Sequence, residues 1–581
     1  MLLRRTIFAA ITLLTATGLT VLLAATLAPG GWTIFKILIL LCFLGVAPWL
    51  GACAGNAIPG FAILLLARDP ARAVLPAPVG TEDGPIRLPT ALAMTVRDED
   101  MRQVLPPLRR LLDGLDRVGA GAMFALFVLS DTRNPAHAAA EALAVAAFRA
   151  ADSDPARIRY RRRPDNAGFK AGNVMDFLDH HAGGFAAAVM LDADSEMTAP
   201  AVLRLVRLLQ AHPDIGIVQH LTVGLSAEAA FARLFQFGMR AGMRVWATGQ
   251  AWWQGDSGPY WGHNAIIRIA PFRTHSRLAP LPDGSAILSH DQVEAAQLRA
   301  AGYGVWMWAD EAGSYEINPP ALPEFLRRDA RWLAGNMQYR HLLRRPGLRA
   351  MGRLQLVQAM LLFSGAPLYV AMLALVAVSV ATGGGASMPR GRLLALVLAW
   401  ALALYSPKLL GYLQVITSPI QRARYGGGAR FALGAACEIL FTLLLDAPAQ
   451  VSKSLALLRL ALGRRADWPA HNRLARGVTW AEAARMFWPH TLFGVVVFAA
   501  LAAGSFWAAL WALPFAGGLL CAIPFCVLTA NPGVSELLRR WHVAAIPEEL
   551  TRQAGGSATD APELALSPNP TSAHHAATGS S

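Results

Sequence analysis

Two aspartates stand directly after an apolar run, in the segment 188–194 that reads AVMLDAD. An apolar run that stops abruptly at two acids is typical of a buried strand with carboxylates at its C-terminal end. Ligands of open α/β sheets bind at that edge, and paired carboxylates can hold a hard divalent cation together with the phosphates that it bridges. Asp192 and Asp194 therefore predict a site for a nucleotide sugar or another diphosphate.

Two more acids end predicted strands. Asp131 closes the run Phe127–Asp131, and Asp98 directly follows an earlier apolar run. A carboxylate at a strand end can hydrogen-bond a base or a ribose, whereas the alternative is that each acid caps the helix that follows it. The sequence leaves both interpretations open.

Lys170 and Asp291 stand where helices are predicted to begin. A lysine close to a glycine at a helix N-terminus suits a phosphate, although a solvated basic loop is the alternative for Lys170. Asp291 either caps its helix or acts as a general base that takes the proton from an attacking hydroxyl. His290 competes for that role, and we favour a structural role for it.

Arg328 and Arg331 are three residues apart on a helix predicted to begin near residue 323, so they share one face. They can neutralise a leaving diphosphate, and Trp332 offers a flat face for a sugar. Snorkelling arginines at a membrane surface are the alternative. Aromatic side chains are dense ahead of this helix, which fits a polysaccharide path: Trp246, Trp252, Trp253, Tyr260, Trp261, Trp306 and Trp308.

These side chains need a sheet to bring them together. Short apolar runs alternate with amphipathic stretches across residues 65–350. Strands are predicted at 90–96, 123–129, 157–162, 187–191 and 215–219, and helices near 99–113, 136–150, 171–181 and 199–211. This alternation predicts an α/β domain with a parallel, doubly wound sheet.

The composition indicates a membrane protein. The chain of 581 residues is 54% hydrophobic and only 15% charged, whereas a soluble domain carries about 25% charged residues. Its net charge of +14 is compatible with nucleic-acid binding, but much of the arginine and lysine flanks apolar runs. That is the positive-inside pattern, so no nucleic-acid partner is expected. The five cysteines show no CxxC spacing, which supports neither a disulfide framework nor a zinc site.

The apolar excess lies at the two ends. Residues 1–60 are predicted to form two transmembrane helices, at 6–28 and 34–55, with Arg4 and Arg5 favouring a cytoplasmic N-terminus. A cleaved signal peptide is the alternative. Residues 351–531 are predicted to form a second bundle of about six spans with interfacial helices, from apolar stretches at 355–381, 393–415, 430–462, 489–510 and 512–530.

Basic residues flank the stretch 430–462 on both sides, so we expect two short helices there, or a span joined to an interfacial helix. Counting a pair gives eight spans in all and puts both termini inside. Lys408, Glu438 and Asp446 lie in or near apolar stretches, where ionisable groups indicate function, with snorkelling as the alternative. Residues 551–581 are expected to be a disordered tail.

At this point the chain resembles a known family. Asp131, the Asp192 and Asp194 pair, Asp291 and the Arg328-x-x-Arg331-Trp332 run resemble the D, DxD, D, RxxRW signature of processive family 2 glycosyltransferases, which include cellulose and hyaluronan synthases. The stretches 260–268, 287–291 and 313–316 look most like the branch that builds the backbone of osmoregulated periplasmic glucans.

The resemblance implies a GT-A α/β domain at 65–350 on the cytoplasmic face of the bacterial inner membrane, inserted in a multi-span α-helical protein. It also implies UDP-glucose as donor, Mg²⁺ or Mn²⁺ as cofactor, and a linear β-1,2-glucan as the growing product. Membrane lipid and a periplasmic glucan-processing protein are the further partners expected. A cellulose- or hyaluronan-type synthase is the first alternative. A non-catalytic sensor or transporter is the second, and the intact acidic set argues against it.

Roles carry over from the resemblance position by position. Asp291 would be the catalytic base, and Asp194 would bind the metal. The donor would be bound by Asp98, Asp131, Lys170, Asp192, Asp194, Arg328 and Arg331. The acceptor would be bound by Trp332, Trp261, His263 and Asn264.

Overall fold

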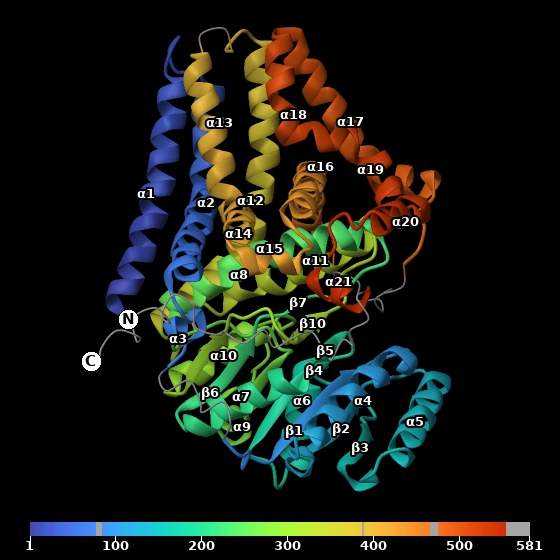
Figure 1. Ribbon diagram of the computed structural model, residues 1–581. Helices are drawn as coiled ribbons and strands as arrows, with labels where there is room; N and C mark the ends of the chain where they lie inside the picture. The colour runs from blue at the N-terminus through green and yellow to red at the C-terminus, as the bar shows by residue number, and fades with distance from the viewer. Residues whose placement is uncertain (77–83, 386–387, 465–474, 554–581) are drawn as a thin grey trace, which may run out of the picture.

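The computed structural model describes residues 1–76, 84–385, 388–464 and 475–553. Long helices from both ends of the chain stand side by side in one layer, and an α/β domain lies below them (Figure 1). Helices α8 (Ala230–Gln254), α11 (Leu322–Met337) and α15 (Pro419–Arg424) lie between the two layers. The α/β domain is therefore seated directly against the helical layer.

A seven-stranded sheet forms the centre of the α/β domain. Its order is β3 (Ile158–Arg162), β2 (Phe124–Ser130), β1 (Thr90–Val96), β4 (Ala187–Asp192), β8 (Ala265–Arg268), β6 (Ile215–His220) and β9 (Gly304–Trp308). Strand β8 runs antiparallel to β4 and β6, with Ile267 opposite Ala188 on one side and Ile217 on the other. The doubly wound α/β fold is confirmed, but the expectation of an all-parallel sheet is wrong at β8, which is antiparallel to both of its neighbours.

Side chains on the central strands alternate between two apolar layers, as the period of a strand requires. Leu92 and Met94 of β1 pack with α4 (Met101–Arg117) and α7 (Ala199–Ala211). Ala91 and Ala93 face the opposite layer, which contains α6 (Phe169–His180), α9 (Ile269–His275) and α10 (Asp291–Ala300). Burial of both faces explains why these strands appear in the sequence as continuous apolar runs.

A small second sheet lies next to the end of β4. It consists of β5 (Ser195–Met197), β10 (Ser314–Glu316) and β7 (Val223–Gly224), with β10 in the middle. Glu316 is paired in register with Ser195, the residue after the second aspartate. This sheet brings residues more than a hundred positions apart to the same edge.

By length and composition, five described helices can cross a membrane: α1 (Leu2–Leu27), α2 (Ile34–Leu66), α12 (Ala350–Ala381), α16 (Gly428–Ala461) and α17 (Trp480–Gly504). Two pairs are bent by 74° and 58°: α13 (Arg390–Leu404) with α14 (Ser406–Thr417), and α18 (Phe506–Leu520) with α19 (Ala522–Thr529). Counting each pair as one span gives seven in the described residues, so the expected eight spans are not reached.

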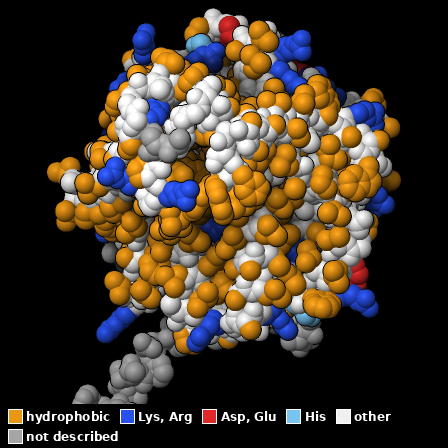
Figure 2. Space-filling model, turned by 90° about the horizontal axis from the view of Figure 1, so that it is seen from above, with side chains coloured by type: hydrophobic (Ala, Val, Ile, Leu, Met, Phe, Trp, Pro, Cys, Tyr) orange, Lys and Arg blue, Asp and Glu red, His pale blue; other side chains and the backbone are white. Residues whose placement is uncertain are grey.

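Seen from above, the helical layer presents mainly hydrophobic side chains, with Lys and Arg scattered among them and few carboxylates (Figure 2). Leu13, Leu14 and Val496 are more than half exposed. An apolar surface of this extent is stable against lipid rather than water. The chain is a membrane protein.

Helix α16 is one unbroken helix of 34 residues, about 51 Å long. Arg424 shortly before it pairs with Glu311 at 2.8 Å, and Arg476 after it pairs with Glu324 at 2.8 Å. Glu311 precedes β10 and Glu324 lies on α11, so both flanks of α16 meet the α/β side. The expectation of two short helices is wrong for this stretch, because residues 428–461 form one helix. Its role as a membrane span stays a prediction.

Ionisable groups between α14 and α16 are paired inside the protein. Lys408 Nζ lies 2.5 Å from Glu438 Oε1 and donates to Thr442 Oγ1 at 2.6 Å. The hydroxyl of Tyr405 donates to Asp446. Glu438 is 1% exposed. Of the two interpretations of these groups, snorkelling toward water is excluded for Glu438.

The C-terminal part of the described chain returns to the α/β domain through α20 (Pro532–Arg540) and α21 (Pro547–Gln553). Glu549 lies 2.7 Å from Arg233 and Glu548 lies 2.5 Å from Arg240, and both arginines of α8 are buried. The disordered tail expected at 551–581 is wrong for residues 551–553, which end α21, and residues 554–581 lie outside the described part of the chain.

Candidate active site

The acid pair lies at the C-terminal end of β4, in the middle of the large sheet. Lys170, in the first turn of α6, places Nζ 2.5 Å from Asp192 Oδ1 and donates to the carbonyl oxygen of Gly262 at 2.8 Å. The hydroxyl of Thr95 on β1 donates to the same carboxylate at 3.0 Å. Two residues predicted to bind the donor, Lys170 and Asp192, are therefore in direct contact.

The charges of Asp192 and Lys170 support each other. Burial opposes the ionisation of Asp192, but the attraction of Lys170 and His263 outweighs it and lowers the pKa to about 2. Burial also works against the charge on Lys170, but the neighbouring carboxylates, Asp192 first among them, raise its pKa above the usual value. The site thus holds a fixed ammonium group among carboxylates, an arrangement suited to a phosphate and its cation.

Asp291 begins α10, and its side chain is 26% exposed. The segment that enters β8 passes close against it. Gly262 has a φ of +77°, and a Cβ at this position would lie 2.0 Å from Asp291 Oδ1. Because the carbonyl of Gly262 also accepts from Lys170, this glycine brings the base candidate and the acid pair to one place.

We expect Gly262→Ala to lower sugar transfer roughly a hundredfold, because the added methyl group must displace the Asp291 carboxylate. Initial rates of nucleotide release from the sugar donor measure the effect. Gly284→Ala is the matched control, since Gly284 has a φ of +78° but no atom within 4 Å of its Cβ position. The control reproduces the backbone strain alone, and equal activities of the two variants would contradict the prediction.

Asp131 follows β2 and is held by Arg163, whose Nε and Nη2 each donate to one of its oxygens at 2.7 Å. Arg163 also donates to the carbonyls of Ala167 and Phe169, at the entry to α6. Asn134 caps the helix after β2. The capping interpretation of Asp131 is therefore wrong, and Asp131 instead fixes the loop that presents Lys170.

Asp98 follows β1 with a φ of +56°. Its backbone N–H donates to Thr132 Oγ1 at 2.8 Å, and its carboxylate lies 3.5 Å from His137 Nδ1. The cap of α4 is Asp100, not Asp98. Asp98 and Asp131 thus both stand at the strand ends of the acidic edge, where a nucleoside can be contacted.

Helix α11 carries the predicted arginines. The guanidinium carbon of Arg328 lies 4.7 Å from the ring centroid of Trp332 and 5.9 Å from that of Phe235. Burial lowers the pKa of Arg328, and Glu316, Asp329 and Asp194 counteract that shift. Arg331 is 7% exposed, whereas Trp332 is 49% exposed. Arg328 therefore faces the acidic edge from an aromatic pocket, while the Trp332 ring is open to a sugar.

Trp261 and His263 border the same site. The backbone N–H of Trp261 donates to Gln219 Oε1 at 2.8 Å. His263 Nε2 lies 3.8 Å from Glu316 Oε2. Both side chains are partly exposed, so both remain available to an acceptor.

Asn264 is fully buried. Its side-chain amide donates to Ser314 Oγ at 2.9 Å and to the carbonyl of Tyr315 at 3.1 Å, and its backbone N–H donates to the carbonyl of Met190 at 2.7 Å. In this structure Asn264 is buried, its side-chain amide binds β10 and its backbone binds β4, so acceptor binding by Asn264 stays a prediction.

Glu316 and Arg163 are site residues that sequence reasoning missed. Burial raises the pKa of Glu316; His263 and Arg328 oppose this shift, and the carboxylates of the acid pair add to it. Glu316 is the last residue of the stretch 313–316, whose resemblance to the family could have identified it. Its position beside Asp194 follows only from the pairing of β10 with β5. Arg163 belongs to the basic run 161–163, whose sequence does not predict the contact with Asp131.

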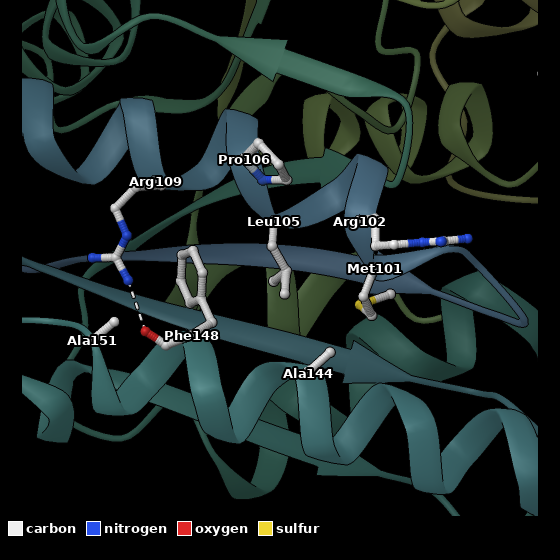
Figure 3. A pocket seen from close by; sticks show the side chains of 8 residues that line it. All are labelled: Met101, Arg102, Leu105, Pro106, Arg109, Ala144, Phe148 and Ala151. Carbon is white, nitrogen blue, oxygen red and sulfur yellow. Dashed lines mark hydrogen bonds between the residues drawn. The ribbon is translucent and has the colours of Figure 1, made fainter.

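A separate groove lies between α4 and α5 (Pro135–Ala150), away from the acidic edge (Figure 3). Arg109 donates to the carbonyl of Phe148 at 2.7 Å at one end of it. None of the residues that line it belongs to the predicted site: Met101, Arg102, Leu105, Pro106, Arg109, Ala144, Phe148 and Ala151. This groove is not part of the active-site candidate.

Comparison with known proteins agrees with this site. The model of glycosyl transferase family group 2 matches residues 188–408, which begin in β4 and include Asp291 and the α11 arginines. Glucans biosynthesis glucosyltransferase H of Xylella fastidiosa is 31% identical over 90% of this chain and 85% of its own length. The protein of the same name from Rhodopseudomonas palustris is 34% identical over 86% of this chain and 72% of its own.

The chain belongs to the glucans biosynthesis glucosyltransferase H family. It is a glycosyltransferase of glucan biosynthesis. A solved mannosyltransferase from Pyrobaculum calidifontis, in complex with GDP-Man and Mn²⁺, is 15% identical, covers 63% of this chain and 98% of its own, and has a TM-score of 0.39. As a member of the family, this chain passes a sugar from an activated nucleotide donor to an acceptor.

Proposed function

We propose that this chain polymerises glucose from UDP-glucose into the linear β-1,2-linked backbone of osmoregulated periplasmic glucans, and that it passes the growing glucan across the bacterial inner membrane. The observation that carries the transfer step is the arrangement around Gly262, where Lys170 contacts Asp192 on one side and Asp291 lies on the other. The glucan product is supported by the relatives, which are named for glucan biosynthesis.

An inverting transfer requires one base and a neutralised leaving group. Asp291 takes the proton of the acceptor hydroxyl as its oxygen attacks the anomeric carbon, and the bond from that carbon to UDP breaks. Lys170, Arg328 and Arg331 carry the positive charge that meets the departing diphosphate. No covalent nucleophile is needed, because one displacement at the anomeric carbon inverts its configuration.

The remaining side chains divide between the two substrates. Asp98 and Asp131 stand at the ends of β1 and β2 and bind the uridine end of the donor. Trp332, Trp261 and His263 contact the glucan acceptor, with the half-exposed ring of Trp332 as the stacking surface. Pyranose rings offer apolar faces that pack on indole.

The acidic edge fits a divalent cation. Lys170 and Thr95 already engage Asp192, so we assign Asp194 as the metal ligand. When bound, Mg²⁺ or Mn²⁺ supplies positive charge at the diphosphate oxygens. Carboxylate oxygens, such as those of Asp194, are the donor type that such hard cations prefer.

We expect Asp194→Asn to raise the Mg²⁺ concentration needed for half-maximal turnover by about tenfold or more, because the cation loses a charged ligand. A Mg²⁺ titration of UDP release measures it, with Asp283→Asn, which alters an exposed turn, as control. Full turnover of the unaltered protein in excess EDTA would contradict the assignment.

We assign the catalytic domain, 65–350, to the cytoplasm and the flanking helices, 1–60 and 351–531, to the membrane. We place α16 along the domain at the membrane surface, because Arg424 before it and Arg476 after it both pair with the α/β side. Four long helices and the two bent pairs then cross. An even number of crossings returns α21 to the side of the domain, where its glutamates bind α8. Lipid then surrounds the bundle, and a periplasmic glucan-processing protein is the partner that receives the product.

The test is UDP release by the purified, detergent-solubilised protein supplied with UDP-glucose and Mg²⁺, followed by digestion with linkage-specific glucanases. Release of UDP with a product cut only by a β-1,2-glucanase is expected. A product cut only by a β-1,4-glucanase would keep the mechanism and move the product to the cellulose type. No release with any UDP-sugar, in vesicles as well as in detergent, would overturn the proposal.

A further inference from the structure

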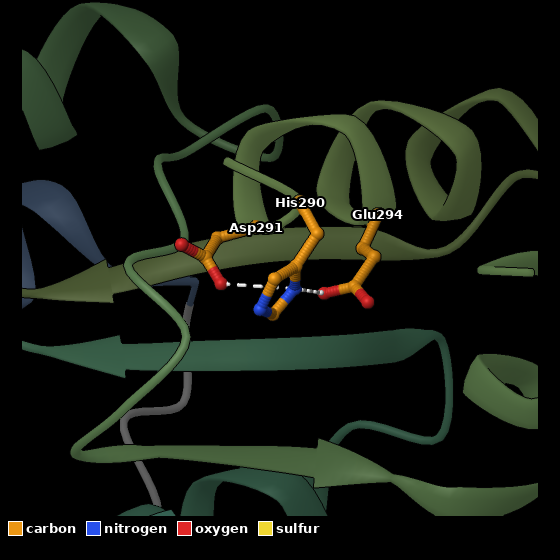
Figure 4. Close-up of side chains that lie close together, drawn as sticks. All are labelled: His290, Asp291 and Glu294. Carbon is orange, nitrogen blue, oxygen red and sulfur yellow. Dashed lines mark hydrogen bonds and ion pairs between the residues drawn. The ribbon is translucent and has the colours of Figure 1, made fainter. Parts of the chain in front are cut away.

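His290 is buried between two carboxylates on the first turn of α10 (Figure 4). Its Nδ1 lies 2.9 Å from Glu294 Oε2 and 3.1 Å from Asp291 Oδ1. The hydrogen bond to Glu294 closes one helical turn, while the contact with Asp291 joins neighbouring residues. The same ring nitrogen thus hydrogen-bonds Glu294 and lies within ion-pair distance of Asp291.

This geometry differs from a metal site made by the same three side chains. In a metal site, the nitrogen and the carboxylate oxygens converge on a shared point that the ion occupies. Here the nitrogen itself occupies the point between the oxygens, at hydrogen-bond distance from both. The imidazolium therefore takes the place that a cation would hold.

The carboxylate of Glu294 stabilises the positive charge on His290. The Glu294 side chain is 2% exposed, and a buried carboxylate is stable only with a partner. Glu294 lies on the protein-interior side of the pair, and Asp291 lies on the open side, where it is 26% exposed. A buried acid thus holds a histidine that in turn holds the base candidate.

We propose that His290, anchored by Glu294, is a positioning residue that fixes the orientation of the Asp291 carboxylate for proton transfer. This inference rests on the proposed role of Asp291 as the base. His290 does not touch the substrates itself. It contacts Oδ1 of Asp291, the same oxygen against which Gly262 lies.

The surroundings of His290 support a charged ring. Burial works against the charge, but Asp291 and Glu294 outweigh it, and Lys170 opposes them only in part, so the pKa of His290 rises to about 9. Tyr260 and Tyr339 are the other titratable groups beside the two carboxylates, and the pKa of each is raised, so both stay neutral below pH 9. Because the pKa is raised, the charged state is complete at neutral pH and is lost as the pH rises through 9.

The pH profile of UDP release tests the proposal. In the unaltered protein we expect turnover to fall on the alkaline side near pH 9, where the imidazolium loses its proton. His290→Gln should remove that alkaline limb and lower the turnover number, because the titrating imidazole that positions the base is gone. The KM for UDP-glucose should stay within about twofold, since His290 has no contact with the donor.

Glu294→Gln is the second variant, and it should shift the alkaline limb instead of removing it. The imidazolium keeps only one carboxylate, so the alkaline limb should shift to lower pH. His180→Gln is the matched control, because His180 pairs with Asp176 four residues away but its side chain is 65% exposed. This control should leave both limbs unchanged.

An unchanged profile in His290→Gln, or an unmoved alkaline limb in Glu294→Gln, would overturn the inference. If the unaltered protein releases no UDP, the proposed function fails, and the His290 charge is then followed by NMR titration of its imidazole in the full-length protein. A midpoint near 9 supports the buried charged pair, and one near the ordinary value of about 6.5 overturns it.

Discussion

Replacing Asp291 by asparagine is expected to lower glucosyl transfer by a factor of about 10²–10⁴, because the amide has the shape of the carboxylate but cannot accept the proton. The affinity for UDP should stay within a few-fold, since Lys170, Arg328 and Arg331 are unchanged. Turnover is measured by UDP release, and UDP binding by calorimetry on the same preparation. A loss of turnover with intact binding separates a base from a residue that only helps to hold the donor.

Asp179→Asn provides the matched control for this change. Asp179 lies on α6, and its side chain is 27% exposed, close to the 26% of Asp291. It pairs with Arg277 at the surface and has no place in the site, so its variant should retain full turnover. Retention of turnover by Asp291→Asn would remove Asp291 from the mechanism.

Replacing Arg240 by methionine is expected to release α21 from the domain. The Arg240 side chain is fully buried, its Nε donates to Glu311 at 3.1 Å, and its Nη1 lies 2.5 Å from Glu548. Removing one member of a buried ion pair costs about 3–5 kcal/mol, because the remaining charge is left without a partner. Amide hydrogen exchange across residues 547–553 should therefore accelerate about a hundredfold or more.

Arg102→Met is the control for this second change. Arg102 also pairs with an acid, Asp100, but its side chain is 91% exposed. Exposed pairs contribute little to stability, so exchange in α21 and in α4 should be unaltered. Unchanged exchange of α21 in Arg240→Met would show that the pairs of α8 do not hold the C-terminal helix.

The sequence predicted the central strands well because burial on both faces gives an unmistakable apolar run. Strand β1 was predicted at 90–96 and is found there, and the acid pair stands at the end of β4 as expected. The same logic failed for β8, a strand of four residues between two longer ones. Its neighbours in space, β4 and β6, come from distant parts of the chain, and no local pattern reports their presence.

The candidate site was predictable in its acids and much less so in the groups that hold them. Asp192 and Asp291 stood out because acids at strand and helix ends are easy to recognise. The partner of Asp131 is Arg163, 32 residues away. The spacing of the two residues does not predict that Arg163 donates to both carboxylate oxygens. The burial of Asn264 was not predictable for the opposite reason: it stands among exposed candidates in sequence, whereas its side-chain NH₂ donates to Ser314 and Tyr315 of β10.

Helix α16 shows a limit of counting apolar residues. Length and basic flanks predicted that both of its ends lie on one side and that a pair of helices makes the return. The stretch is instead a single helix, and Arg424 before it and Arg476 after it pair with the α/β side. Hydropathy reports that a helix avoids water, and it does not report the direction in which the helix lies.

The docking of α21 also bears on how a polymer can move through this protein. The α/β domain is joined to the membrane layer where α2 leads into it, where α11 leads out to α12, and a third time through the glutamates of α21 on α8. These three attachments restrain the domain against rocking on the membrane layer. Under the proposed function, we expect individual side chains and loops, and not swings of the whole catalytic domain, to move the glucan forward by one sugar.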